Sequence, residues 1–430
     1  MNNFTKKTAA LHNLGCKVNS YETEAMQELL IKAGYEIVPF SELADIYVIN
    51  TCSVTNIADH KSRQMIHKAK KKNPDAIVVA AGCYVQTAEE ELKKDLAVDI
   101  VIGNNKKGEL LSLIRAYKEE QGYGDVIDIN DGMQVFEELL VDHTGDRTRA
   151  FLKIQDGCNQ FCSYCIIPYA RGRIRSRKPE EVIREVSGLA LNGTKEIVLT
   201  GIHLSSYGKD IGSSLLELIR EIHTISGVER IRLGSLEPRI ITEEFVKELS
   251  QLKKVCPHFH LSLQSGSDSV LKRMNRTYTT EDYLRGCEIL RRYYEHPAIT
   301  TDIIVGFPGE TQEEFAETLA YIRRIRFYEV HVFKYSKRKN TPAAQMPDQI
   351  EEGVKTQRSK ILSESVTEIK EEFISYYTGK TVSVLFEQEK KKDGKSYYEG
   401  FTPEYVKVRY ESGRPLWNQL VEVVFSRDIV

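Results

Sequence analysis

Strand-length apolar runs alternate with helix-length amphipathic stretches over the first hundred residues, and this alternation limits the fold more than any other feature. The apolar runs are residues 8–14, 45–50, 76–81 and 99–102. The amphipathic stretches between them are residues 21–33, 57–72 and 88–96. Because this rhythm is typical of βαβ units, we expect an α/β domain with a parallel sheet over residues 1–110.

A second series of the same kind begins at Phe151. Its strand candidates are residues 151–154, 196–200, 230–234, 258–263, 300–306 and 328–333. Its helix candidates are residues 179–191, 214–225, 242–252, 280–294 and 312–325. Six successive βα units favour a barrel, or an open part of one, so we expect a partial (β/α)6 barrel over residues 144–378. Residues 111–143 contain a charged helix-like piece and glycine-rich acidic text, which predict a linker with a short hairpin.

The last fifty residues differ from the rest. A long charged helix is predicted near residues 349–377, and short β-type runs follow it at 380–387, 396–401, 406–410 and 420–425. Glycine, proline and aspartate separate these runs. The pattern predicts a small all-β module over residues 379–430.

Composition excludes several classes of protein. The 430 residues are 41% apolar and 28% charged, as in ordinary globular chains, and 60 basic residues nearly balance 62 acidic ones. A whole-protein basic field is therefore excluded, and any nucleic-acid contact must come from local patches. The chain has no run of 18 apolar residues and its first residues have no apolar signal segment. We expect a cytoplasmic protein without a membrane contact.

Three cysteines lie within eight residues, in the pattern Cys158-x3-Cys162-x2-Cys165 just after the first strand of the second series. Disulfides are rare in a reducing compartment, where clustered cysteines indicate a metal site or catalysis. A zinc site needs a fourth ligand, and no further cysteine or histidine follows until His203. A [4Fe–4S] cluster held by three cysteines would keep one iron open for another ligand. Zinc and unligated cysteines are the weaker alternatives.

Three other cysteines each follow a predicted strand of the N-terminal sheet. They are Cys16, Cys52 and Cys83. Taken singly, each is typical of a small buried hydrophobic residue. However, parallel strands share one carboxyl edge, which would bring all three thiols together at the rim where α/β sheets bind ligands. The sequence thus predicts a second three-cysteine site, while Cys256 and Cys287 have no partner spacing and are expected to be structural.

The segment CNQFCSYC, residues 158–165, resembles the signature of the radical S-adenosylmethionine (SAM) superfamily. The resemblance implies that the open iron chelates SAM, that SAM is cleaved to a 5′-deoxyadenosyl radical, and that Tyr164 lies near the adenine. Matching text follows the later strands, where barrel enzymes assemble their sites. It adds these expected SAM-binding residues: Thr200, Gly201, Ser235, Glu237, Gln264, Gly306 and Pro308. Singly, a glycine after a strand indicates only a turn.

Over essentially its whole length the chain resembles the methylthiotransferase family, which replaces a C–H bond by C–S–CH3. The resemblance implies two [4Fe–4S] clusters, SAM as methyl donor and radical source, and a C-terminal TRAM module that binds RNA. The text GCKVN at residues 15–19 most resembles the branch that modifies N6-threonylcarbamoyladenosine at position 37 of tRNA. The alternatives are isopentenyladenosine in tRNA, an aspartate of ribosomal protein S12, and a non-catalytic iron–sulfur sensor that binds RNA.

The expected partners are the anticodon loop of tRNA, an electron donor such as flavodoxin or ferredoxin, and a sulfur donor. No general acid or base stands out as catalytic. Four alternating arginines, Arg171, Arg173, Arg175 and Arg177, would share one side of an extended segment, where they suit phosphate or the SAM carboxylate. A solvated charged strand is the alternative. Lysine-rich runs at 337–339 and 390–392 are candidate RNA contacts, with a solvated surface as the alternative. The aromatic residues of the C-terminal module are divided between its core and a surface that could stack RNA bases.

Overall fold

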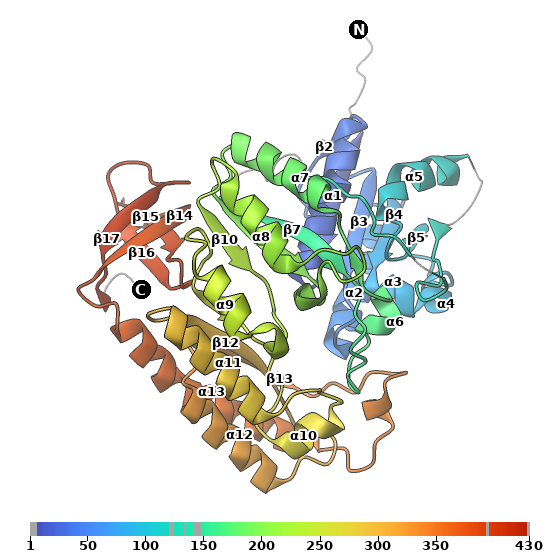
Figure 1. The fold of residues 1–430 in the computed structure, drawn as a ribbon. Coiled ribbons are helices and arrows are strands. Elements are labelled where there is room, and N and C mark those ends of the chain that lie inside the picture. The colour runs from blue at the N-terminus through green and yellow to red at the C-terminus, as the bar shows by residue number, and fades with distance from the viewer. Residues whose placement is uncertain (1–6, 120–123, 133, 142–147, 393–394, 428–430) are drawn as a thin grey trace.

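The chain forms an N-terminal parallel sheet, a central open barrel and a C-terminal antiparallel sheet (Figure 1). The structure is a computed structural model, and it describes residues 7–119, 124–132, 134–141, 148–392 and 395–427. In Figure 1 the N-terminal sheet, coloured blue to cyan, and the C-terminal sheet, coloured red, lie on opposite sides of the barrel. This architecture confirms the predicted α/β class with a small all-β end.

The N-terminal sheet is parallel throughout, in the order β2-β1-β3-β4-β5-β6. Its strands are β1 (Thr8–Asn13), β2 (Glu36–Ile37), β3 (Ile46–Thr51), β4 (Ile77–Gly82), β5 (Ile100–Ile102) and β6 (Gly124–Asp125). The intervening helices are α1 (Lys17–Lys32), α2 (Asn56–Lys72), α3 (Cys83–Thr87), α4 (Glu89–Leu92), the 3₁₀ helix η1 (Lys107–Glu109) and α5 (Leu110–Lys118). The strands β3 and β4 are almost wholly buried, as expected for parallel strands with helices on both faces.

Two local predictions in this region are wrong. The helix expected at 88–96 is instead split into α3, which begins at Cys83, and α4, which ends at Leu92. Ala88, at φ −137°, separates the two because it leaves the helical region of backbone space. The described part of 111–143 contains no hairpin, since β6 pairs in parallel with β5 and extends the N-terminal sheet. The expected domain boundary at 143 and 144 lies outside the described residues.

The barrel consists of six parallel strands with helices outside them. The strands are β7 (Arg149–Asp156), β9 (Glu196–Gly201), β10 (Arg230–Leu233), β11 (His258–His260), β12 (Ala298–Val305) and β13 (Glu329–Lys334), and the short β8 (Arg175–Ser176) runs antiparallel to β7. Isolated bridges from Ile231 to Val255 and from Leu236 to Leu261 join the two halves. No pairing between β13 and β7 occurs among the residues that the structure describes, so the barrel is open.

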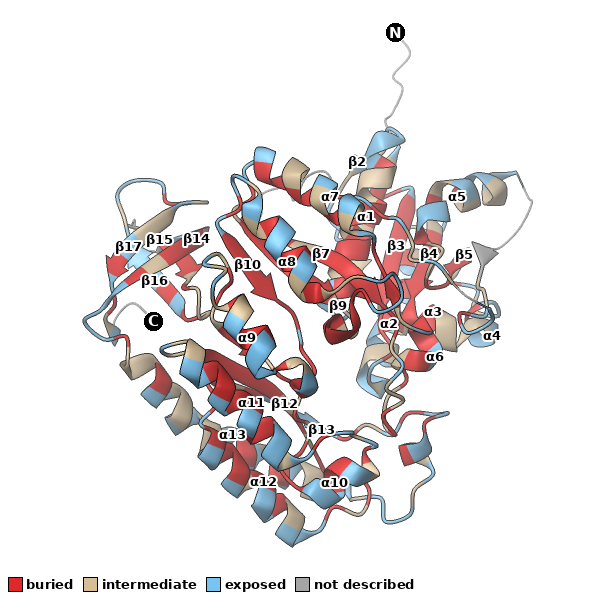
Figure 2. Ribbon diagram, viewed as in Figure 1, coloured by how far each residue is buried: buried red, intermediate tan, exposed pale blue. Residues whose placement is uncertain are grey.

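The helices of this part of the chain are α6 (Ile167–Arg171), α7 (Pro179–Leu191), η2 (Leu204–Ser206), α8 (Leu215–Thr224), η3 (Pro238–Ile240), α9 (Glu243–Leu249), α10 (Asp268–Arg273), α11 (Thr280–Tyr293), α12 (Gln312–Ile325), η4 (Pro342–Ala344) and α13 (Glu352–Ser375). The helices α7, α8, α9, α11, α12 and α13 cover the outer face of the barrel and bury its apolar residues. Figure 2 shows the buried strands in red and the pale blue outer faces of these helices. None of the described helices is long and apolar enough to cross a membrane.

The C-terminal module is an antiparallel sheet in the order β16-β15-β14-β17. Its strands are β14 (Thr381–Lys392), β15 (Lys395–Phe401), β16 (Lys407–Glu411) and β17 (Leu420–Val424). The module docks on the amino ends of barrel strands, where Arg230 donates to the Phe401 and Ser383 carbonyls and Arg232 donates to the Pro403 carbonyl. It therefore lies at the end of the barrel opposite the cysteine loops.

Candidate active site

The loop after β7 folds back on itself and gathers Cys158, Cys162 and Cys165. Gly157 permits this fold, because it has φ +71° and a Cβ atom there would lie 1.8 Å from the Arg173 carbonyl oxygen. The Cys158 amide donates to the Gly172 carbonyl at 3.0 Å, and the Cys165 amide donates to the Cys162 carbonyl at 3.0 Å. The three thiols are close enough to interact electrostatically with one another.

The surroundings of these thiols suit ligands of a metal cluster. Burial raises the pKa of Cys158 to about 11 and that of Cys165 to about 12, so neither is a ready nucleophile by itself. Metal binding deprotonates such thiols. The Arg276 guanidinium lies 3.1 Å from the Cys162 sulfur, and cationic donors of this kind stabilise cluster sulfurs and tune the cluster's reduction potential. The donor set therefore fits a [4Fe–4S] cluster with one iron not bound by cysteine.

The structure also brings Cys16, Cys52 and Cys83 together. They follow the carboxyl ends of β1, β3 and β4, three neighbouring strands of the parallel sheet. The thiols of Cys16 and Cys52 each interact electrostatically with that of Cys83. Gly15 has φ +110°, and a Cβ atom there would lie 3.0 Å from the Cys52 sulfur, so the backbone before Cys16 passes directly against Cys52. Burial raises the pKa of Cys52 to about 11.

Two side chains from outside the sheet hold the Cys83 sulfur. The Nε atom of Arg171 lies 3.3 Å from it, and the Nδ2 atom of Asn104 lies 3.6 Å from it. Arg171 ends α6, only six residues after Cys165. The loop that carries one group of cysteines thus leads directly to a contact with the other group.

Arg171 belongs to a buried ionic network between the N-terminal sheet and the barrel. Its guanidinium lies 2.8 Å from Glu22 on α1 and 3.1 Å from Asp156 on β7. Lys107, Lys153 and Arg175 also belong to the network, and every one of these side chains is at most 3% exposed. Burial alone would raise the pKa of Glu22, but its three cationic neighbours hold that pKa well below the ordinary value. Glu22 is therefore ionised, and the network fixes α1 against the barrel.

A cavity of about 220 Å³ lies where the barrel meets the N-terminal domain, with Cys165 in its wall. The barrel contributes Cys165, Gln264 and Asp302 to its wall, and the N-terminal domain contributes Val54 and Thr55 from the loop that follows Cys52. Tyr164 and Phe333 add aromatic surface. A ligand in this cavity would contact both domains, beside the Cys158 loop and close to the Cys52 loop.

Two of the predicted SAM-binding residues, Tyr164 and Gln264, line this cavity. The ring of Tyr164 meets Phe307 edge-on at 6.5 Å, and Gln264 has the left-handed φ of +75°. Glu237 is buried and interacts electrostatically with Cys158, whereas the nearby Ser235 is exposed.

The other predicted SAM-binding residues lie in packed backbone at strand ends. Thr200 is buried on β9, and Gly201 lies against Gln155, where a Cβ atom would be 2.9 Å from the Gln155 Oε1 atom. Gly306 packs on the stem of Lys355 in α13, and Pro308 is buried two residues later. For all eight residues, contact with SAM stays a prediction.

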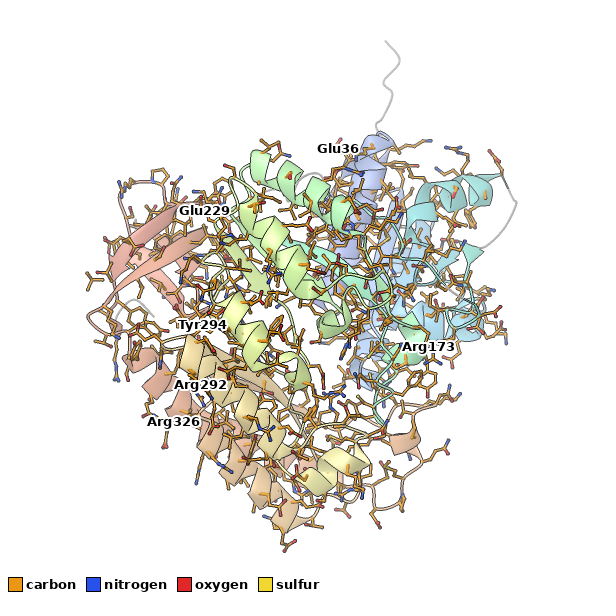
Figure 3. The ribbon with its side chains drawn as sticks, in the orientation of Figure 1. Glu36, Arg173, Glu229, Arg292, Tyr294 and Arg326 are labelled. Carbon is orange, nitrogen blue, oxygen red and sulfur yellow. The ribbon has the colours of Figure 1, made fainter. Side chains whose placement is uncertain are left out.

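The expectation that four arginines share one side of an extended segment is wrong. Arg171 is helical, and Arg175 and Arg177 are buried; Arg177 lies at hydrogen-bond distance from Glu185. Only Arg173 is exposed, beside α6 (Figure 3), with its guanidinium 4.6 Å from the Phe161 ring centre. Charge neutralisation by buried carboxylates explains the difference, because a buried arginine without a partner is strongly disfavoured.

Sequence reasoning missed Arg276, and it assigned Arg171 to phosphate or the SAM carboxylate. Arg276 follows α10, more than a hundred residues from the cysteine that it contacts. No spacing within the sequence signals such a contact. Cys256 and Cys287 are buried as expected, and the structure shows no other cysteine in contact with them in the described ranges.

Comparison with known proteins gives two matching families. Residues 152–322 match the Radical SAM superfamily, and residues 8–103 match Uncharacterized protein family UPF0004. TsrM from Kitasatospora setae, a radical S-adenosylmethionine methyltransferase, has a TM-score of 0.59 at 17% identity, covering 79% of this chain and 77% of that one. At this identity the likeness shows the fold alone.

Curated relatives match almost the whole chain. The Bacillus subtilis protein named threonylcarbamoyladenosine tRNA methylthiotransferase MtaB is 45% identical over 97% of this chain and 93% of its own length. Its namesake from Thermotoga maritima is 38% identical over 95% and 92%. The Acetivibrio thermocellus protein named tRNA-2-methylthio-N(6)-dimethylallyladenosine synthase is 37% identical over 97% and 88%.

The barrel and its cysteine loop define a radical SAM enzyme. The chain belongs to the tRNA methylthiotransferase family, and it is therefore a transferase. The predicted use of SAM and of iron–sulfur chemistry is confirmed by this membership.

Proposed function

We propose that the chain attaches a methylthio group to C2 of N6-threonylcarbamoyladenosine at position 37 of tRNA. One observation carries the proposal: two separate groups of three cysteines each converge at the carboxyl ends of parallel strands, in a chain that is 45% identical to a protein named for this reaction. Both groups lie at carboxyl ends of parallel strands, where α/β proteins and barrels place their sites.

Six cysteines are the proposed cluster ligands. Cys158, Cys162 and Cys165 would hold the [4Fe–4S] cluster that binds SAM, and Cys16, Cys52 and Cys83 would hold a second one. When bound, these groups supply the radical cleavage of SAM and the delivery of the methylthio group. The electron donor and the sulfur donor expected from the sequence belong to this proposal as well.

Side chains of this chain fix the positions of the two groups of cysteines. Arg276 and Arg171 each place a guanidinium against one sulfur of a different group of cysteines, at 3.1 and 3.3 Å. The buried network around Glu22 holds α1, and with it Cys16, against the barrel. Fixed side chains of this kind maintain the geometry that a reaction between two bound groups requires.

Nucleoside analysis tests the choice of substrate. Cells that lack the chain should lose 2-methylthio-N6-threonylcarbamoyladenosine and accumulate the unthiolated nucleoside, as measured by mass spectrometry of digested tRNA. The matched control is the same strain carrying the gene on a plasmid. Loss of methylthio-isopentenyladenosine, with the threonylcarbamoyl nucleosides unchanged, would assign the chain to the other tRNA branch, to which relatives at 37–40% identity belong by name.

Exposed lysines of the C-terminal module provide the proposed RNA contact. Lys390 and Lys391 lie on β14 and are exposed, and Glu399 keeps Lys407 and Arg409 as partners if Lys390 is removed. Replacing Lys390 and Lys391 by Ala should weaken tRNA binding and reduce the slope of log K against log salt by about 1 to 2, because each phosphate contact releases counterions. The control is Lys360→Ala on the exposed face of α13. An unchanged slope in the Lys390 and Lys391 double variant would show that these lysines do not contact the RNA phosphates.

A further inference from the structure

Three polar side chains meet inside the barrel on three neighbouring strands. They are His260 on β11, Asp302 on β12 and His331 on β13, and one ligand atom of each lies within 4.8 Å of the other two. The Nε2 atom of His260 is 3.2 Å from Asp302, and its Nδ1 atom is 2.9 Å from the Thr300 hydroxyl. The two histidine rings stack with centres 5.8 Å apart.

Strand alternation explains why these side chains point inward. On the same strands, Phe259, Ile303 and Val330 belong to the apolar core under the outer helices. Their neighbours along each strand face the opposite side, which is the interior of the open barrel. His331 is exposed and Asp302 is 29% exposed, so this interior is open to solvent.

Lys17 faces the same space from the start of α1. Its ammonium interacts electrostatically with Arg232, Arg149, Glu196 and Asp302. The imidazole of His258 interacts in the same way with Lys17, His260 and His331. Lys17 is exposed to solvent and directly follows Cys16 in the chain. We call Lys17, His260, Asp302 and His331 the histidine recess.

The histidine recess is continuous with the candidate active site. Asp302 lines the 220 Å³ cavity together with Cys165, and Lys17 follows Cys16 directly in the chain. In adenine, C2 and C6 are both bonded to the ring atom N1, so a substituent on N6 leaves the ring only a few bonds from C2. A base placed with C2 near both groups of cysteines would therefore direct its N6 substituent into adjoining space.

The charges of the recess match a threonylcarbamoyl group better than a metal ion. That group ends in a carboxylate, which needs cationic or N–H donors, and in a hydroxyl, which can donate to a carboxylate. A divalent cation would meet the Lys17 ammonium near its single carboxylate ligand, and like charges oppose one another in a confined site. An isopentenyl group could form no hydrogen bond with these polar side chains, so it would gain less from binding in this recess.

We propose that Lys17, His260 and His331 bind the carboxylate of the threonylcarbamoyl group, and that Asp302 accepts a hydrogen bond from its hydroxyl. The proposal rests on the proposed function and names the residues that distinguish this substrate from other adenosines at position 37. His331 makes the best test, because it is exposed in the recess and is not one of the residues that line the cavity beside Cys165.

Binding of synthetic anticodon stem-loops tests the proposal without turnover. One RNA carries N6-threonylcarbamoyladenosine at position 37 and the other carries adenosine, and affinities are measured by fluorescence anisotropy. In His331→Gln the preference for the modified RNA should fall by about tenfold to a hundredfold, the usual effect of losing a charge-assisted hydrogen bond. His223→Gln, on the outer helix α8, is the matched control and should keep the preference.

A third RNA separates the carboxylate from the hydroxyl. Its N6-glycinylcarbamoyladenosine keeps the carboxylate but lacks the hydroxyl, so Asp302→Asn should weaken only the threonylcarbamoyl RNA, whereas His331→Gln should weaken both. An unchanged preference in His331→Gln would overturn the proposal, as would stoichiometric zinc that the wild-type protein binds and His331→Gln does not. Failure of the wild-type enzyme to methylthiolate the threonylcarbamoyl RNA would instead overturn the proposed function itself.

Discussion

Replacing Cys158, Cys162 and Cys165 together by Ala should abolish 5′-deoxyadenosine formation, because the iron that chelates SAM would be gone. Replacing Cys16, Cys52 and Cys83 should leave reductive SAM cleavage in place and abolish methylthio transfer to tRNA. Iron content should fall by about half in each triple variant if both clusters hold four irons. Iron analysis and chromatography of the nucleoside products measure these outcomes.

The control for both variants is Cys256→Ala combined with Cys287→Ala. These two thiols are buried, and neither is near a cysteine of the two groups in the described part of the structure. Iron content should stay at the wild-type level in this control. If the Cys16/Cys52/Cys83 variant kept all its iron and its methylthio transfer, the three residues would be ordinary buried thiols and the assignment of a second cluster would fail.

Arg171→Met should lower the free energy of unfolding by about 3–5 kcal/mol, since it removes one partner of a buried ionic network. Glu22 and Asp156 would both lose their contact with the guanidinium, although Lys153 would still bridge them. The measurement is urea denaturation followed by circular dichroism, with the wild-type protein and the variant prepared in the same way.

Arg173→Met is the matched control, two residues further along the chain. Arg173 is exposed and contacts the face of Phe161, an interaction that contributes about 0.5–1 kcal/mol at such sites. Its replacement should therefore change stability by no more than about 1 kcal/mol. Equal effects of the two substitutions would show that the network adds nothing beyond an ordinary surface arginine.

The local sequence pattern was sufficient to predict most helices and strands and to predict that the N-terminal cysteines converge. Helices α7 and α12 begin and end at the predicted residues, because Pro179 at the start of α7 and the capping box of Thr311 with Glu314 are local signals. Cys16, Cys52 and Cys83 could be placed together from the sequence alone, since parallel strands share a carboxyl edge.

Contacts between distant segments could not be predicted in this way. Arg171 pairs with Glu22 from α1, 149 residues earlier, and only the packing of α1 on β7 makes that possible. Alternation of arginines at 171, 173, 175 and 177 indicated an extended surface strand, but the buried carboxylates Asp156 and Glu185 draw three of them inward. Tertiary structure determines the partners of a buried charge, and the spacing of charged residues along the chain does not reveal them.

The docking of the C-terminal module on the amino ends of the barrel strands would set a minimum length for an RNA bound as we propose. The cysteine groups lie at the carboxyl ends, and a strand of eight residues such as β12 spans roughly 26 Å. An RNA that reaches both ends at once must be at least that long, as a folded stem with its loop is. The length of the barrel would then favour long RNA over short ligands. A free nucleoside or a short oligonucleotide could occupy only one end, and it would lose the gain in affinity that comes from two linked contacts.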